Sequence, residues 1–260
     1  MCPYIYIFNR TIPTYGLCIV LAAIVCVSFA ISRAKKNQIL VEDVFIVFAS
    51  GFGFAMIGAK LLYLIVTYSL EDIINFIKNG DFSFLGGSGL VFLGGLICSI
   101  LGGWVGSLLA KRKFADFEAL IIPIIPVGHA IGRIGCLMAG CCYGKLYNGP
   151  FAVHYKNITT GLWTEESYFP IQLLEALLNC IIAVVLYIRS NKMHREYFLL
   201  LDYLMYYSIV RFCLEYLRGD AMRGIYDGFS TSQWISIALL LINIVIRVLK
   251  WKQEKSKNPS

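Results

Sequence analysis

The sequence predicts an all-α integral membrane protein with seven transmembrane helices and a small extramembrane segment at residues 140–169. The chain is 58% hydrophobic and only 15% charged, whereas soluble domains usually carry about 25% charged residues. Apolar runs close to the ~20 residues that cross a bilayer recur along the whole chain. Basic residues gather in short clusters between these runs, which is typical of cytoplasmic loops.

Each predicted helix is an apolar run with polar or turn-forming residues at its ends. The fourth carries Pro123 and Pro126, which should kink it, and the fifth begins at Pro170, which suits the first turn of a helix. We expect one transmembrane domain over residues 1–260, with a cytoplasmic tail at residues 252–260. The seven spans are expected at residues 15–33, 42–68, 88–110, 117–139, 170–189, 197–217 and 231–250.

The basic clusters also predict the orientation of the chain. They follow the first, third, fifth and seventh spans, so the N-terminus should lie outside and the C-terminus in the cytoplasm. The first span should be retained, because Arg10 is the only basic residue before it and no cleavage signal follows. Since the net charge of +7 lies between apolar runs, it does not indicate nucleic-acid binding. The clusters are Arg33, Lys35 and Lys36; Lys111, Arg112 and Lys113; Arg189, Lys192 and Arg195; and Lys250, Lys252, Lys255 and Lys257.

Two external segments have recognisable patterns. Residues 69–87 mix apolar and charged side chains, which favours an amphipathic helix in the membrane interface. Residues 140–169 form the head-like external segment, where alternating apolar residues after Gly149-Pro150 favour a small hairpin. The segment also holds a glycosylation sequon at Asn157, a motif that is common by chance.

The fourth predicted helix contains two ionisable side chains, which are costly inside a membrane and usually face a functional cavity. His129 and Arg133 are four residues apart and therefore share a helix face. Gly128, Gly132 and Gly135 flank them and would let a lipid or another helix approach closely. The alternative is an arginine near the end of a helix that extends towards the lipid head groups.

The sixth predicted helix carries a second polar stripe. Tyr207, Arg211 and Glu215 follow each other at four-residue intervals, and Asp202 and Arg218 add further charges to the same helix. A buried ion pair that only orients helices is one interpretation. The other is an arginine held in place for phosphate, whose geometry matches the planar fork of guanidinium donors.

The fifth and seventh predicted helices add polar groups that face the same outer half of the membrane. Gln172, Glu175 and Asn179 share one face of the fifth helix, and Gln233 follows a capping sequence at the start of the seventh. Two arginines that face one cavity would repel each other unless an anion lay between them. The sequence therefore predicts a site for a phospholipid phosphate.

At these residues the sequence resembles the bacterial prolipoprotein diacylglyceryl transferases, and the resemblance covers most of the chain. The motifs occur in the same order as in that family and on the same number of expected spans. They are Tyr15-Gly16, Gly94-Gly95, Gly132-Arg133 through Gly144, Pro170 through Ala176 with Gln172 and Glu175, Arg211 through Arg218, and Ser232-Gln233 through Ser236.

The resemblance implies a multi-pass enzyme of the bacterial cytoplasmic membrane that uses no metal and no organic cofactor. Its partners would be phosphatidylglycerol and the lipobox peptide of a preprolipoprotein, to whose cysteine thiol it would transfer the diacylglyceryl group. Arg133 and Arg211 would hold the phosphate, Glu215 would orient Arg211, and Tyr15 and Tyr207 would line the head-group site. Residues assigned to substrate binding are Tyr207, Gly94, Gly95, Gly132, Gly144, Gln172, Glu175, Gln233 and Arg218.

The sequence departs from the family pattern at three places. Leu93 replaces a histidine, Cys136 replaces an asparagine, and Ala139-Gly140-Cys141 replaces Asn-Gly-Glu. His129 is the one nearby residue that could act as a base at neutral pH, although a structural histidine is equally compatible with the sequence.

Cys136, Cys141 and Cys142 form a cluster with four open interpretations. They could pack between helices, form a disulfide on the outer face, or supply a catalytic thiol, helped by Arg133 on the same helix. A metal site is the fourth, and we assign none because the spacing lacks a second ligand pair. Among these we count Cys136 with the catalytic candidates Arg133, Arg211, Glu215, His129 and Tyr15.

Two functions compete with transfer to a lipobox thiol or to a related acceptor. A membrane transporter would also need intramembrane charges, but the sequence shows no internal repeats. A lipid-binding protein without enzymatic activity would fit the replaced histidine and asparagine.

Overall fold

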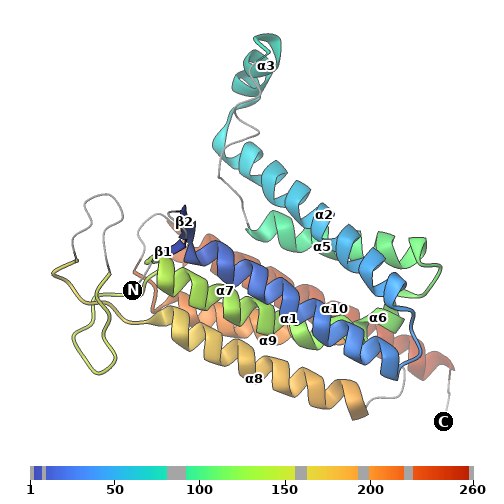
Figure 1. The fold of residues 1–260 in the computed structure, drawn as a ribbon. Helices are drawn as coiled ribbons and strands as arrows, with labels where there is room; N and C mark the ends of the chain where they lie inside the picture. The colour runs from blue at the N-terminus through green and yellow to red at the C-terminus, as the bar shows by residue number, and fades with distance from the viewer. Residues whose placement is uncertain are drawn as a thin grey trace. The chain divides into compact units, whose positions relative to one another are not determined.

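The protein is mainly helical in the computed structural model, which describes residues 3–7, 10–80, 92–155, 163–192, 199–219 and 225–257 (Figure 1). Five helical segments are long and apolar enough to cross a membrane, so the prediction of an all-α membrane protein is supported. Two shorter helices, α5 (Phe92–Leu109) and α9 (Leu199–Glu215), coincide with the other expected spans. The five segments are Thr14–Lys36, Val41–Thr67, Phe114–Ala139, Ile171–Asn191 and Thr231–Gln253.

The chain divides into two compact units. The larger comprises Met1–Phe29 and Glu118–Ser260, and the smaller comprises Ala30–Phe117. The expected single domain over residues 1–260 stays a prediction.

The larger unit is a bundle of helices. α7 (Ile125–Ala139) packs against α8 (Ile171–Lys192), which in turn packs against α9, and α9 packs against α10 (Thr231–Lys257). The first part of α1 (Thr14–Lys36) also belongs to this unit. α10 continues to Lys257, so most of the expected tail at 252–260 is helical. Buried apolar side chains form the core of the larger unit: Ile122, Ile182, Leu186, Leu199, Tyr203 and Tyr207.

The predicted kink in the fourth helix is present. α6 (Phe114–Ile121) and α7 are separated by the 3-10 turn η1 (Ile122–Ile124), which contains Pro123. Pro126 lies in the first turn of α7. A proline removes a backbone donor and clashes with the preceding turn, so two of them break the regular helix here.

The smaller unit is built on two closely packed helices, α2 (Val41–Thr67) and α5. A Cβ atom added at Gly94 would overlap the backbone of Gly58, which explains why glycine occupies that position. Arg112 Nε lies 2.6 Å from Asp43 Oδ2 and joins the ends of this pair of helices.

The segment after α2 contains the amphipathic helix that the sequence predicts. α3 (Leu70–Lys78) begins after Ser69, whose hydroxyl accepts a hydrogen bond from the Asp72 backbone N–H at 3.2 Å. The Asp72 carboxylate accepts one in return from the Ser69 backbone N–H at 3.0 Å. Residues 81–87 of the predicted segment lie outside the described part of the chain.

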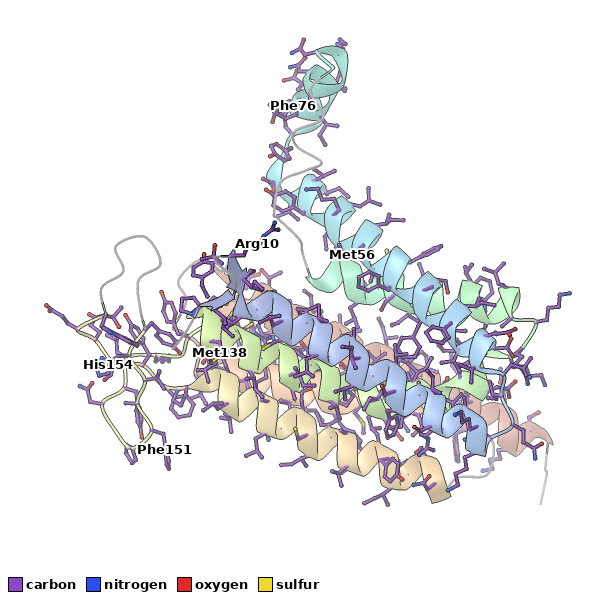
Figure 2. The ribbon with its side chains drawn as sticks, in the orientation of Figure 1. Arg10, Met56, Phe76, Met138, Phe151 and His154 are labelled. Atoms are coloured by element: carbon purple, nitrogen blue, oxygen red, sulfur yellow. The ribbon has the colours of Figure 1, made fainter. Side chains whose placement is uncertain are left out.

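The expected hairpin within residues 140–169 is reduced to isolated backbone bridges. Tyr168 pairs with Leu146 and with Val153, and no regular strand forms in the described residues 140–155 and 163–169. Figure 2 shows that Phe151 and His154 lie beyond the end of α7 at which Met138 is found. Phe151 is 87% exposed. The sequon at Asn157 lies outside the described residues.

Two short hairpins were not anticipated from the sequence. β1 (Tyr4–Ile7) pairs with β2 (Arg10–Pro13), and β3 (Ile225–Tyr226) pairs with β4 (Phe229–Ser230). Thr14 closes the first hairpin, because its backbone N–H and its hydroxyl both donate to the carbonyl of Pro3, at 3.0 and 2.8 Å.

Candidate active site

Glu175 on α8 joins the two ionisable side chains of α7. Its Oε1 atom lies 2.8 Å from Arg133 Nη2 and 3.7 Å from His129 Nε2, and its side chain is only 2% exposed. His129 and Arg133 are one helical turn apart, so both reach the same carboxylate oxygen. The sequence placed Glu175 on one helix face with Gln172 and Asn179, but it could not identify the partners of Glu175, because they belong to another helix.

Arg211 on α9 is held by a second carboxylate. Its Nη2 atom lies 2.8 Å from Glu215 Oε2 and donates a hydrogen bond of 3.0 Å to Ser232 Oγ at the start of α10. Ser232 was not among the predicted site residues, although its place beside Gln233 in the first turn of the seventh predicted helix was a usable signal. The ion pair alone would fit a purely structural role.

Each arginine retains an unused donor. Arg211 Nη1 and Arg133 Nε are buried, and neither has a hydrogen-bond partner among the described residues. Buried polar groups are nearly always hydrogen-bonded, so an unpaired donor needs an explanation. A bound anion would supply the missing acceptors.

Tyr207 connects the two arginines. The centroid of its ring lies 5.3 Å from that of His129, and its hydroxyl is within electrostatic range of Arg133, Arg211 and Arg218. His129 is itself within range of Arg133 and Arg211. Glu175 and Glu215 lie beside Arg133 and Arg211, and Arg218 is a third guanidinium group within range of Tyr207. The region is therefore suited to an anion.

The three clustered thiols meet at the end of α7. The Sγ atoms of Cys136, Cys141 and Cys142 all lie within 4.8 Å of one another. α7 ends at Gly140, which has a left-handed backbone with φ of 73°, and Cys142 also has a positive φ of 58°. The Cys141 thiol donates a hydrogen bond of 3.6 Å to the Cys136 carbonyl, and the guanidinium groups of Arg218 and Arg133 lie within electrostatic range of Cys142.

Tyr15 at the start of α1 borders the thiol cluster. A Cβ atom added at Gly135 would lie 3.2 Å from Tyr15 Cδ2, so the ring covers this glycine. Tyr15 is 44% exposed, and its hydroxyl is within electrostatic range of the three thiols and of Arg133. The neighbouring Gly132 is less crowded, because an added Cβ would meet Ile19 Cδ1 only at 4.0 Å.

Known proteins of one family match nearly the whole chain. A family model described as prolipoprotein diacylglyceryl transferase matches residues 4–249. The chain belongs to the prolipoprotein diacylglyceryl transferase family. A phosphatidylglycerol–prolipoprotein diacylglyceryl transferase of Clostridium tetani is 31% identical over 243 residues, which cover 92% of this chain and 94% of the relative. A second relative, phosphatidylglycerol–prolipoprotein diacylglyceryl transferase 2 of Clostridium perfringens, is 29% identical over 95% of this chain and 96% of its own.

Two amides that the family resemblance placed in the substrate site have partners within the protein. Gln172 donates a hydrogen bond of 2.7 Å to the Cys141 carbonyl and accepts one of 3.2 Å from the Tyr155 hydroxyl. Gln233 accepts a hydrogen bond of 2.9 Å from the Ser230 backbone N–H. Both amides fix segments that border the site, and Tyr155 is a supporting residue that the sequence did not reveal.

Gly144 and Arg218 bring the external segment against the end of α9. The Gly144 N–H donates to the Phe169 carbonyl at 3.2 Å, and a Cβ atom at Gly144 would lie 2.5 Å from that oxygen. Only glycine fits this approach. Gly144 also forms a backbone bridge with Arg218, whose side chain is thereby placed beside the candidate site.

Gly94, Gly95 and Asp202 make contacts that the sequence did not reveal. Gly94 and Gly95 belong to the smaller unit, where they pack against α2. Asp202 lies on the same helix as Arg211, as the sequence predicts, but the two side chains have different partners. Asp202 instead pairs with Arg189 at 2.8 Å and Arg247 at 2.5 Å.

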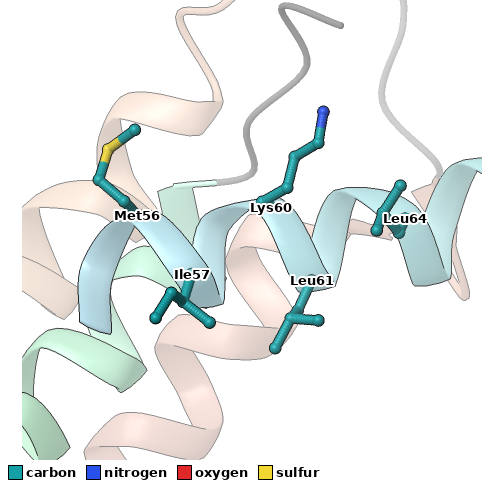
Figure 3. Close-up of a pocket in the computed structure, with 5 residues that line it drawn as sticks. All are labelled: Met56, Ile57, Lys60, Leu61 and Leu64. Carbon is teal, nitrogen blue, oxygen red and sulfur yellow. The ribbon is translucent and has the colours of Figure 1, made fainter. Parts of the chain in front are cut away.

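A hollow of about 330 Å³ lies along α2 in the smaller unit (Figure 3). Its wall is almost entirely apolar, and Lys60 is its one charged lining residue. It contains none of the candidate site residues of this family member. The lining residues are Met56, Ile57, Lys60, Leu61 and Leu64.

Proposed function

We propose that this protein transfers the diacylglyceryl group of phosphatidylglycerol to the thiol of a lipobox cysteine and releases glycerol phosphate. Family membership supports this reaction, because the named relatives match nearly the whole chain. The observation that carries the proposal is the pair of buried donors, Arg133 Nε and Arg211 Nη1, that have no partner among the described residues. A lipid phosphate offers the oxygen acceptors that these donors lack.

In the proposed reaction the two arginines bind the phosphate, and Glu175 and Glu215 keep them in place. The acceptor sulfur attacks the glyceryl carbon that carries the phosphate oxygen. The carbon–sulfur bond forms as the carbon–oxygen bond breaks, and the oxygen leaves with the electron pair on glycerol phosphate. Guanidinium donors aimed at the phosphate stabilise this developing charge.

His129 is the proposed base. The thiol is a strong nucleophile only after it loses its proton, and an imidazole can accept that proton at neutral pH. Glu175 Oε1 lies 3.7 Å from His129 Nε2, and its negative charge opposes the repulsion that Arg133 and Arg211 exert on an imidazolium there. Tyr15 and Tyr207 are proposed to line the head-group site, and Cys136 to stand at its edge.

We further propose seven spans, with the N-terminus outside and the C-terminus in the cytoplasm. In this orientation the ends of α7 and α9 and the starts of α8 and α10 lie on the outer side. Arg133 lies in the second half of α7 and Arg211 near the end of α9, while Glu175 and Ser232 lie near the starts of α8 and α10. The site would then open towards the outer leaflet, where a lipobox peptide is presented after export.

A transfer assay tests the proposal. The purified protein, in vesicles of phosphatidylglycerol, is incubated with a lipobox peptide, and the thioether product and glycerol phosphate are measured. We expect Arg133→Ala and Arg211→Ala to reduce the rate by about 100-fold or more. Arg189→Ala is the matched control, since Arg247 continues to pair with Asp202.

Transfer that survives both alanine substitutions would contradict the proposed site. Binding of phosphatidylglycerol without transfer to any thiol would favour the rival interpretation, a lipid-binding protein. The observation that favours a lipid-binding protein is the replacement of the family histidine and asparagine by Leu93 and Cys136.

A further inference from the structure

The thiols at the end of α7 lie close enough to bind one metal ion together. Cys136 is in the last turn of the helix, while Cys141 and Cys142 follow the left-handed residue Gly140. Cys141 and Cys142 follow Cys136 by five and six positions, and the three sulfurs lie within 4.8 Å of one another. We infer that Cys136, Cys141 and Cys142 form a binding site for one thiophilic metal ion such as zinc.

The geometry favours a metal over a disulfide. Zinc–sulfur bonds of about 2.3 Å place the sulfurs of a tetrahedral site about 3.8 Å apart, so small side-chain rotations would bring these thiols to that spacing. A disulfide requires about 2.05 Å between two sulfurs and leaves the third thiol unused. The ion site uses all three. It leaves a fourth position for water or a substrate atom, as in zinc sites that take part in chemistry.

The surrounding charges suit such a complex. Three thiolates and one divalent ion carry one negative charge, and the thiols lose their protons to the solvent when the ion binds. The guanidinium groups of Arg133 and Arg218 are within electrostatic range of Cys142 and compensate that charge. The carbonyl groups at the end of α7 add a partial negative charge that also favours a cation.

The backbone around the thiols is held in place by several contacts. Gln172 donates to the Cys141 carbonyl at 2.7 Å, and the Gly219 N–H donates to the Tyr143 carbonyl at 3.2 Å. Cys142 itself adopts a φ of 58°, which is uncommon for a residue other than glycine and marks a constrained position. A metal site with a fixed backbone needs little rearrangement to bind its ion.

The sequence spacing alone gave little reason to expect this site. Zinc sites usually combine two separated pairs of ligands, and only one group of cysteines occurs here. The left-handed end of the helix at Gly140 brings the sulfur of Cys136 close to those of Cys141 and Cys142, which sequence spacing does not reveal.

Cadmium binding to the full-length protein in detergent, under anaerobic conditions, tests the inference. We expect one equivalent of cadmium to produce a thiolate charge-transfer band, and zinc to displace it. Substituting residues that only hydrogen-bond to metal ligands already costs about 10- to 100-fold in metal affinity. We therefore expect a loss of about 100-fold or more from replacing a ligand itself, in Cys136→Ser, Cys141→Ser or Cys142→Ser. Cys180→Ser and Cys213→Ser, which change exposed free cysteines, should bind like the unaltered protein.

Alkylation of the unaltered protein provides a test that needs no variant. Zinc should protect Cys136, Cys141 and Cys142 from an alkylating reagent, as read by mass spectrometry of peptides, and leave Cys180 reactive. Equal alkylation with and without zinc, or cadmium binding that the three serine substitutions leave unchanged, would overturn the inference. Both tests measure metal binding and not diacylglyceryl transfer, so their outcome is independent of the proposed function.

Discussion

The larger unit contains two clusters of arginines and carboxylates that use their donors differently. In the Asp202 cluster, Oδ2 pairs with Arg189 and Oδ1 pairs with Arg247, while Arg247 Nε donates to Asn243 Oδ1 at 2.7 Å. In the candidate active site, Arg133 and Arg211 each keep one buried donor without a hydrogen-bond partner among the described residues. The same residue types therefore serve packing in one place and leave capacity for a ligand in the other.

Exposure reinforces this difference. The side chains of Arg189 and Arg247 are 41% and 33% exposed, so solvent can satisfy their remaining donors. Those of Arg133 and Arg211 are only 14% and 10% exposed. An unpaired donor therefore costs little free energy at Arg189 and Arg247. It costs much more at Arg133 and Arg211, unless a ligand binds there.

Neutralising the central carboxylate of each cluster should give the largest difference in transfer rate between the two clusters. Glu175→Gln leaves Arg133 buried beside an uncharged amide, and we expect transfer to fall by about 100- to 1000-fold. Asp202→Asn should lower the thermal stability and leave the rate per folded molecule close to that of the unaltered protein. Transfer assays on folded material, paired with thermal unfolding, distinguish the two effects. Equal losses of activity in the two variants would remove the distinction.

Replacing an arginine by lysine tests whether fork geometry matters at each cluster. Arg211→Lys keeps the charge but loses the planar donors, so we expect the rate at low phosphatidylglycerol to fall by about tenfold or more. Arg247→Lys should change it by less than about twofold, since only packing around Asp202 is affected. The dependence of rate on lipid concentration is the measurement. Indifference to Arg211→Lys would argue against a forked contact with phosphate.

Removing the neutral partner of each arginine should give the smallest effects. Ser232→Ala deletes the hydroxyl that accepts from Arg211, and we expect about a fivefold loss of transfer, in line with about 1 kcal/mol for one hydrogen bond. Asn243→Ala deletes the acceptor of Arg247 Nε and the donor to the Leu201 carbonyl, so it should lower the thermal stability alone. A loss of transfer in Asn243→Ala larger than in Ser232→Ala would reverse the expected order.

Much of the fold follows from the sequence because helix formation in a membrane depends on local composition. The apolar runs locate the helices, and Pro123 and Pro126 locate the break before α7. The hairpin of β1 and β2 was not predicted. Backbone contacts such as the one between Thr14 and Pro3 close it, and they do not depend on a recognisable residue pattern. Such contacts leave no clear pattern in four-residue strands.

The sequence predicted which residues of the candidate site share a face of one helix, but not which helices meet there. The spacing of His129 and Arg133 shows that they share a face, but their joint partner Glu175 lies on another helix. Asp202 and Arg211 lie nine positions apart on one helix, about 13 Å along its axis, and pair with different residues. That distance puts the two side chains at different depths, and helix spacing alone does not decide which depth holds a ligand.

The central claim is that Arg133 and Arg211 bind one phosphate together. A structure of the protein determined in bilayers that contain phosphatidylglycerol tests it most directly. We predict density for a phosphate within hydrogen-bond distance of Arg133 Nε and Arg211 Nη1. A lipid phosphate bound elsewhere, with these two nitrogens still unoccupied or turned towards different partners, would contradict the account.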